Sequence, residues 1–257
     1  MCGILLYISK KKIPYKTFKD SLELINHRGP DNTSIISYSN NEFNYNSNID
    51  FEYNFLIGHK RLSIIDLSKK SNQPFINNEN KKFFLYNGEF YNYKNYSNKF
   101  TQNSDALTFF DLLNKNSSEA FQKIIGMWGA VYGDIKKNKI IISRDLYGKK
   151  PLYYFLNEGT LIISSEIKSI HNLLNIKKKI NTKALSMFLC FKFSPFMNDG
   201  ETFYENIKSV KPGEILNINL ANFKTFSKKI NFPENLKTQN IKEDDLLNNF
   251  TNDFSNS

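Results

Sequence analysis

The first third of the chain contains several short apolar runs and one segment with apolar residues at helical spacing. Residues 2–8 form an apolar run bounded by polar residues, a pattern typical of a buried β-strand. Apolar residues recur at helical spacing across 16–25 and predict a helix there. The Asn-rich segment 37–54 is expected to be a surface loop. Further apolar runs predict strands at 55–59 and 82–86.

The middle of the chain combines helices with short strands. One helical pattern begins at Ser104, and a second covers residues 182–191. Because strands and helices do not alternate regularly as βαβ units, we expect antiparallel sheets covered by helices, an α+β fold. Short apolar runs with glycines in or beside the turns predict strands at 127–134, 139–144, 151–156 and 160–164, and a strand pair after Gly213.

The C-terminal segment is polar and ends on an amphipathic pattern. Residues 233–240 are expected to form a linker, and residues 244–254 a helix. The sequence offers the apolar face of this helix no obvious partner. That face carries Leu246, Leu247, Phe250 and Phe254.

Composition excludes several classes of protein. The formal net charge is +10, from 35 Lys and Arg against 25 Asp and Glu. The lysines are scattered, so we expect a solvated surface that binds neither nucleic acid nor membranes. No apolar run approaches the roughly 18 residues of a membrane helix, and we expect a cytoplasmic protein. The cysteines at positions 2 and 190 form no disulfide framework and no metal-ligand spacing, and Cys190 is expected to lie in the core.

Cys2 is the first candidate for chemistry. Removal of Met1 would leave Cys2 with a free α-amine beside its thiol. Both groups titrate near neutral pH, so the amine can act as the base for the thiol. The alternative is a small apolar residue that happens to lie near the terminus.

Three further positions suit the hydrolysis of an amide. Asn87 and Gly88 follow an apolar strand and can offer a side-chain and a backbone N–H to an oxyanion, although Asn-Gly is more often a hairpin turn. Arg61 can hold a carboxylate with two parallel hydrogen bonds; its alternative is an exposed ion pair. Asp105 could pair with an ammonium group, and its alternative role is a helix cap.

These residues belong to a series of short motifs that appear in a fixed order. The motifs are Met1-Cys2-Gly3, His27-Arg28-Gly29-Pro30-Asp31, Gly58-His59-x-Arg61-Leu62-Ser63-Ile64-Ile65-Asp66, Gln73-Pro74, Tyr86-Asn87-Gly88-Glu89-x-Tyr91-Asn92, Ser104-Asp105, Gly126-Met127-x-x-Ala130, Arg144-Asp145-x-x-Gly148-x-Lys150-Pro151-Leu152-Tyr153-Tyr154 and Ser164-Ser165-Glu166-x-Lys168. The series strongly resembles the class II (N-terminal nucleophile) glutaminase domain of the glutamine-hydrolysing asparagine synthetases. Each motif is weak alone, and the specificity lies in their joint order.

The resemblance implies a fold and a set of roles. The fold is a four-layer αββα sandwich of two antiparallel sheets between helices, the Ntn-hydrolase type. Cys2 would be the nucleophile with its own α-amine as base, and Asn87 with Gly88 the oxyanion hole. Arg61 would hold the glutamine carboxylate, and Asp105 with Glu89 its ammonium. The residues implied to bind glutamine are Arg61, Leu62, Ser63, Ile64, Ile65, Asn87, Gly88, Glu89 and Asp105.

The resemblance also implies a division of the chain. Residues 2–218 would be the glutaminase domain, and residues 219–257 a linker and the first helix of an ATP-dependent synthetase domain. That domain's Ser-Gly-Gly-x-Asp-Ser phosphate loop has no match in this sequence. We therefore expect no cofactor and no metal for glutamine hydrolysis, and ATP with Mg²⁺ only for the absent domain. The expected partners are glutamine as substrate, a synthetase domain or subunit, and a second copy of the chain in a homodimer.

The sequence departs from the family at two positions and leaves alternatives open. Leu107 stands where the family commonly has a glutamate, and Lys149 replaces an apolar residue and is expected on the surface. An alternative of the same fold is an amidotransferase that delivers ammonia to a sugar or peptide. A catalytically silent assembly domain is a second alternative. Nucleic-acid binding would depend on net charge alone.

Overall fold

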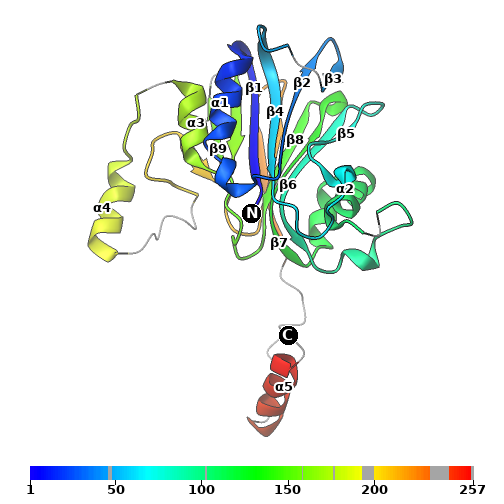
Figure 1. Ribbon diagram of the computed structural model, residues 1–257. Coiled ribbons are helices and arrows are strands. Elements are labelled where there is room, and N and C mark those ends of the chain that lie inside the picture. Colours follow the sequence, from blue (N-terminus) through cyan, green and yellow to red (C-terminus); the bar gives the residue numbers. More distant parts are fainter. Residues whose placement is uncertain are drawn as a thin grey trace.

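The computed structural model describes residues 1–45, 48–101, 103–157, 159–175, 177–192, 200–231 and 243–255. Within these ranges the strands form two antiparallel sheets that pack face to face (Figure 1). The first sheet has the order β11-β9-β10-β1-β4-β2-β3. Its strands are β1 (Gly3–Pro14), β2 (Asn32–Ser39), β3 (Glu42–Asn44), β4 (Glu52–Arg61), β9 (Tyr153–Asn157), β10 (Thr160–Ser164) and β11 (Ile207–Ser209).

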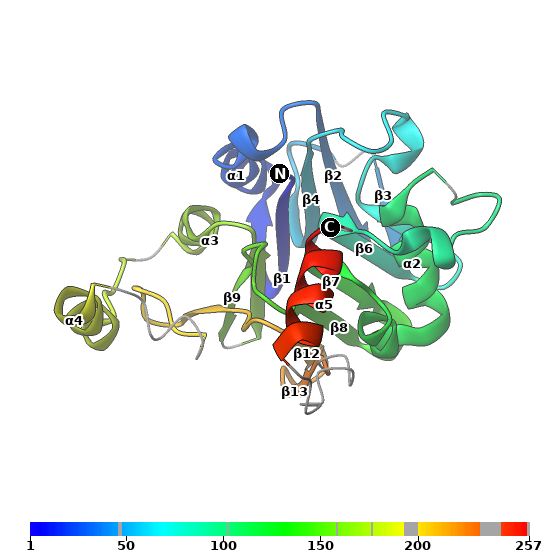
Figure 2. The same ribbon diagram turned by 90° about the horizontal axis from the view of Figure 1, so that it is seen from below.

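The second sheet lies against the first with the order β13-β12-β8-β7-β6-β5. Helices cover the outer faces of the sandwich on opposite sides, as Figure 2 shows. Helices α1 (Tyr15–Glu23) and α3 (Ile167–Leu174) pack on the first sheet, and α2 (Asp105–Asn116) with the 3-10 turn η4 (Ser117–Gln122) packs on the second. The strands of the second sheet are β5 (Phe75–Asn77), β6 (Lys82–Phe90), β7 (Gly126–Asp134), β8 (Lys139–Arg144), β12 (Glu214–Asn219) and β13 (Thr225–Lys229).

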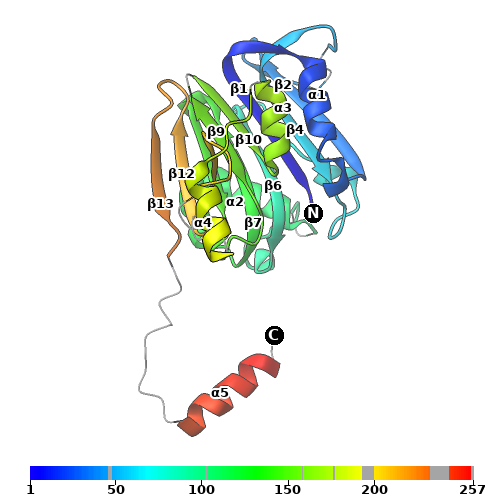
Figure 3. The ribbon, with the colours of Figure 1, turned by 90° about the vertical axis from the view of Figure 1, so that its left-hand side faces the viewer.

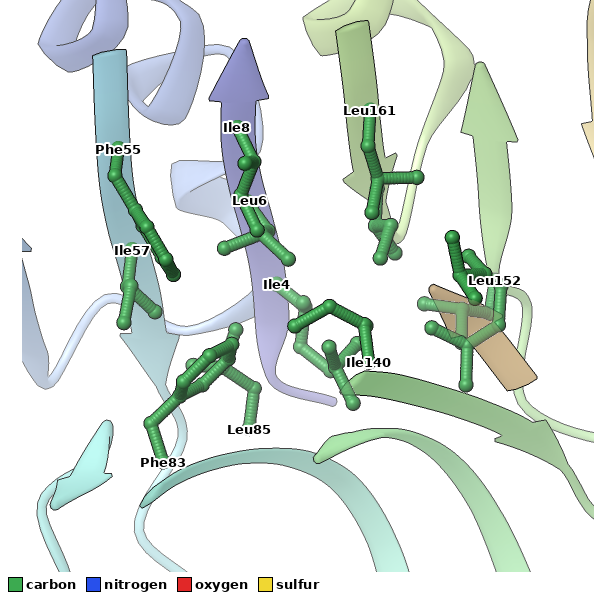
Figure 4. Packing of buried hydrophobic residues seen from close by; sticks show 14 of the residues in the cluster. Ile4, Leu6, Ile8, Phe55, Ile57, Phe83, Leu85, Ile140, Leu152 and Leu161 are labelled. Carbon is green, nitrogen blue, oxygen red and sulfur yellow. The ribbon is translucent and has the colours of Figure 1, made fainter. Parts of the chain in front are cut away.

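Three clusters of buried apolar side chains fill the spaces between these layers, and β1 contributes to two of them. Ile4, Leu6 and Ile8 point into the core between the sheets, where Figure 4 shows them opposite side chains of β6. Leu5 and Tyr7 point the other way, into the core under α1 and α3. Because both faces of the strand are buried, its sequence is a continuous apolar run. The predicted α+β sandwich of two antiparallel sheets between helices is confirmed.

The expectation of a surface loop over residues 37–54 is wrong. The structure forms β2, β3 and the start of β4 in this segment, and residues 46–47 lie outside the described ranges. The last two strands at this end of the sheet contribute few buried apolar side chains, Ile36 from β2 and Phe43 from β3. Polar residues fill the other positions, so asparagine content conceals the strand alternation.

The expected burial of Cys190 is also wrong. Its helix α4 (Thr182–Phe191) forms as predicted, but it stands at the margin of the sandwich (Figure 1). Ala184 is the buried residue of this helix, and Cys190 is exposed. The apolar sequence of α4 therefore reflects a helix surface outside the three cores.

The C-terminal part is described at both ends of the expected linker, and residues 233–240 themselves lie outside the described ranges. β13 pairs with β12, so the second sheet continues past residue 218. The predicted helix is present as α5 (Glu243–Ser255), apart from the two sheets in Figure 3. Its apolar side chains, Leu246, Leu247, Phe250 and Phe254, are exposed. Among the helices that the structure describes, none is long and apolar enough to cross a membrane.

A buried histidine links the two sheets and makes stability depend on pH. His59 on β4 is buried, and its Nε2 lies 3.3 Å from the Tyr86 carbonyl oxygen on β6. Its Nδ1 has no hydrogen-bond partner among the described residues. Burial lowers the pKa of His59 from 6.5 to about 4. Between these values the unfolded chain binds a proton that the folded chain excludes, so acidification favours unfolding.

We expect the unfolding free energy to fall as the pH drops from 6.5 towards 4. His59 alone would contribute a slope of up to about 1.4 kcal/mol per pH unit. Urea unfolding of the protein and of a His59→Gln variant, followed across this range, measures the contribution. The variant should lose less stability on acidification. Equal slopes in both proteins would contradict the assignment of this effect to His59.

Candidate active site

A cavity of about 240 Å³ lies beside the start of β1 and the ends of β4 and β6. It collects residues that precede β1, together with residues from the end of β4, the end of β6 and the first turn of α2. The structure brings every predicted site residue except Ser63 to this cavity. The Ser63 N–H instead donates to Asp31 Oδ2 at 2.7 Å. Ile64 and Ile65, 64% and 46% exposed, form part of the rim.

Cys2 lies at one side of the cavity, held by backbone contacts. The Leu62 N–H lies 3.5 Å from Cys2 Sγ, and Sγ lies 3.7 Å from the Leu62 carbonyl oxygen. The Cys2 N–H donates to Asn87 Oδ1 at 2.9 Å, which connects the first sheet to the second. Burial raises the pKa of the Cys2 thiol, so the thiolate forms near neutral pH only if neighbouring groups stabilise it.

The Asn87 side chain is arranged as an acceptor on one side and a free donor on the other. Its Oδ1 is occupied by Cys2, while its Nδ2 is buried without a hydrogen-bond partner among the described residues. An unpaired buried donor costs free energy unless a ligand satisfies it. An oxygen that gains negative charge beside Cys2 would be such a ligand.

Gly88 is required by the close pairing of β6 with β7. The register places Gly88 opposite Trp128. A Cβ atom at position 88 would lie 2.1 Å from the Met127 carbonyl oxygen, so no larger residue fits without moving the backbone. Glycine at this position thus keeps the two strands in register beside the cavity.

The Arg61 guanidinium is buried and tied to the loop that follows β4. Nη1 donates to the Ser68 carbonyl oxygen at 2.9 Å and to Asn72 Oδ1 at 2.6 Å, and Nη2 donates to the Asp66 carbonyl oxygen. These contacts use three of its five N–H donors and leave Nε and one hydrogen of Nη2. Two donors remain for a carboxylate.

Asp105 begins α2, and its predicted alternative role as a helix cap is wrong. The cap is Ser104, whose hydroxyl accepts from the Leu107 N–H. Asp105 Oδ2 accepts from the Phe90 N–H at 3.1 Å and from the Tyr86 hydroxyl at 3.3 Å. Burial raises the pKa of Asp105, and the charge of Glu89 adds to the rise. A cation between these carboxylates would relieve this repulsion.

Several residues that support the cavity were not assigned a role from the sequence. The Gln73 side chain forms two hydrogen bonds with the backbone of Tyr86. Gln73 Nε2 donates to the Tyr86 carbonyl oxygen at 3.1 Å, and the Tyr86 N–H donates to Gln73 Oε1 at 2.6 Å. The Ser71 hydroxyl contacts Asp66 Oδ2 at 2.5 Å and Ser104 Oγ at 2.9 Å. Gln73 and Asp66 stand in the motifs, and Ser71 carries no signal outside them.

The turn after α1 fastens the backbone of Cys2. Arg28 Nε donates to the Cys2 carbonyl oxygen at 3.0 Å, and its Nη1 donates to Glu166 Oε1 at 3.1 Å. His27 Nε2 lies 2.8 Å from the same carboxylate. His27 and Arg28 thus fix the turn beside the cavity. Across the described ranges no group of His, Cys, Asp and Glu side chains could hold a metal ion.

Comparisons with known proteins agree with this arrangement. Residues 1–229 match the model of the glutamine amidotransferase domain family. A Methanocaldococcus jannaschii protein that carries the name asparagine synthetase [glutamine-hydrolyzing] 2 is 34% identical over 217 residues, 76% of this chain and 40% of that protein. Asparagine synthetase [glutamine-hydrolyzing] 2 of Bacillus subtilis is 29% identical over 233 residues, 86% of this chain and 29% of its own length. The chain thus spans less than half the length of these relatives.

The fold has a counterpart among solved structures. The glutamine phosphoribosylpyrophosphate amidotransferase of B. subtilis, solved with ADP and GMP, superimposes with a TM-score of 0.63 at 16% identity, over 90% of this chain and 50% of that one. This likeness concerns the fold, and the family match covers most of the sequence. On that match the chain belongs to the glutamine amidotransferase domain family.

Proposed function

We propose that this chain hydrolyses glutamine to glutamate and ammonia at the cavity beside Cys2. The observation that carries the proposal is one cavity with a half-buried thiol, an unpaired amide donor and groups of both charges for an amino-acid head. The thiol belongs to Cys2, the donor to Asn87, and the charged groups to Arg61 and Asp105. The family match supports the same reaction.

Cys2 would act through its sulfur once Met1 is removed. The α-amine takes the thiol proton, and the thiolate attacks the side-chain amide carbon of glutamine. The amine then gives its proton to the departing ammonia, which leaves a γ-glutamyl thioester. Water hydrolyses the thioester to glutamate and restores the thiol. Asn87 Nδ2 and the Gly88 N–H would stabilise the oxyanion in both steps.

The amino-acid head would bind between opposite charges. Arg61 offers two unused N–H donors to the α-carboxylate, and its contacts with the loop after β4 fix the plane of the guanidinium. Asp105 and Glu89 would receive the α-ammonium. An amide that lacks this head leaves buried charges unpaired, which would select glutamine over simple amides.

The destination of the ammonia is a separate part of the proposal. We propose aspartate as the acceptor, because the matching relatives include several asparagine synthetases. That step would need ATP and Mg²⁺, held by a synthetase domain or subunit, and the glutamine cavity would need no cofactor. The boundary of the glutaminase domain at residue 218 and the synthetase helix beyond it stay predictions.

Replacing Cys2 by Ala should reduce ammonia release from glutamine at least about a thousandfold, because the nucleophile is lost. The measurement is ammonia produced by the purified chain, after intact mass has established that Met1 is absent. Cys190→Ser is the matched control, since it removes the chain's other thiol, which lies outside the cavity. Substantial activity in Cys2→Ala, or activity in a protein that keeps Met1, would refute the mechanism.

Replacing Asn87 tests the oxyanion donor. Asn87→Ala should lower kcat by about 10²–10³ with a smaller effect on KM, because the donor acts mainly in the transition state. Asn87→Asp keeps the acceptor for the Cys2 N–H and loses the donor, so it should be impaired at least as strongly. Near-normal kcat in Asn87→Asp would show that the Nδ2 donor is dispensable.

Arg61→Lys should raise the KM for glutamine about 10-fold or more with a smaller change in kcat, because one point charge replaces a paired donor. Steady-state kinetics give both constants. Thermal unfolding provides the control, since the loop contacts of Arg61 also change. An unchanged KM in a variant of normal stability would exclude the carboxylate contact.

A further inference from the structure

Lys150 lines the same cavity as Cys2 and has no role in the mechanism above. It lies in the segment that connects β8 to β9. Its neighbour Lys149 is exposed and lines a separate surface hollow. The two adjacent lysines are thus placed differently: Lys150 lines the cavity of Cys2, and Lys149 does not.

The backbone of Lys150 is fixed on both sides. Its N–H donates to Asp145 Oδ2 at 3.0 Å, and its carbonyl oxygen accepts from Arg144 Nε at 2.8 Å. Asp145 and Arg144 are themselves buried. These bonds fix the backbone of Lys150 relative to the second sheet, at a point from which the residue lines the cavity.

The Lys150 charge is not neutralised locally. No carboxylate forms an ion pair with its ammonium within the described part of the chain, whereas Arg28 is paired with Glu166. The nearby Asp145 carboxylate is occupied by backbone N–H groups, including those of Trp128 and Tyr147. A cation without an ion-pair partner lowers the pKa of an amine that shares its cavity.

The charges around the chain terminus can be named from each neighbouring element. Burial lowers the pKa of the α-amine of Met1, and the Arg28 and Lys150 cations lower it further. The Cys2 thiolate and Asp31 oppose this effect. Glu89, Asp105 and Arg61 line the same cavity, and the Arg61 and Arg28 cations lower the pKa of the Cys2 thiol. Removal of Met1 passes the amine to Cys2, which lines the cavity with Lys150.

We propose that the positive charge of the Lys150 ammonium acts on this site and favours the unprotonated forms of the Cys2 amine and thiol. The inference rests on the proposed function of Cys2. It assigns Lys150 no contact with the reacting atoms. Its effect is to extend the pH range of the reactive form towards neutrality.

The experiment uses a Cys190→Ser background, in which Cys2 is the remaining one of the two cysteines. The rate of alkylation by iodoacetamide is measured against pH in four proteins: the background, Lys150→Met, Lys150→Arg and Lys149→Met. Lys150→Met should move the midpoint upwards by about 0.5–1 pH unit. Lys150→Arg and Lys149→Met should keep the midpoint of the background. High salt should shrink the difference, since it screens the charge.

In Lys150→Met, the pH at which ammonia release falls to half on the acidic side should rise by a similar amount. An unchanged alkylation midpoint in Lys150→Met, or an equal shift in Lys149→Met, would overturn the inference even in a protein that releases ammonia. Absence of ammonia release from the unmodified chain at every pH would instead contradict the proposed function. Alkylation still tests Lys150 in that case.

Discussion

The site depends on the two sheets coming within hydrogen-bond distance at one end of the sandwich. The Cys2 N–H reaches Asn87 Oδ1 across this gap, and His59 approaches the Tyr86 carbonyl oxygen one residue away. Both contacts need the apolar core between the sheets, because it sets their separation. A change in that separation would take the thiol away from the amide donor. The fold and the chemistry are coupled at this point.

Polar groups around the cavity are held by hydrogen bonds to neighbouring residues. Arg28 fastens the Cys2 carbonyl oxygen, Gln73 fastens the backbone of Tyr86, and Arg61 holds its loop. Each contact uses part of a side chain's hydrogen-bonding capacity. Asn87 lines the cavity and keeps an unpaired Nδ2, so a residue that supports the site also retains a donor for a ligand.

The sequence indicated the buried strands, and most of the candidate site residues that it named line one cavity, for physical reasons. β1 has apolar side chains on both faces, which gives a run that is easy to recognise. The site motifs combine residue types with narrow chemical uses. By contrast, β2 and the edge strand β3 bury few apolar residues, and α4 is apolar without being in a core. The contacts of Ser71 depend on the folded loop and have no local signal, and the motif that contains Gln73 does not show that its side chain binds the backbone of Tyr86.

The pairing of Gly88 with Trp128 has a practical consequence. Trp128 is the chain's only tryptophan, buried beside Phe109 and Phe121, and its indole N–H donates to Ser143 Oγ at 3.1 Å. Its intrinsic fluorescence therefore arises from a single dry environment next to the glycine of the cavity. The protein carries an optical reporter at the strand that borders its own site, without any introduced label.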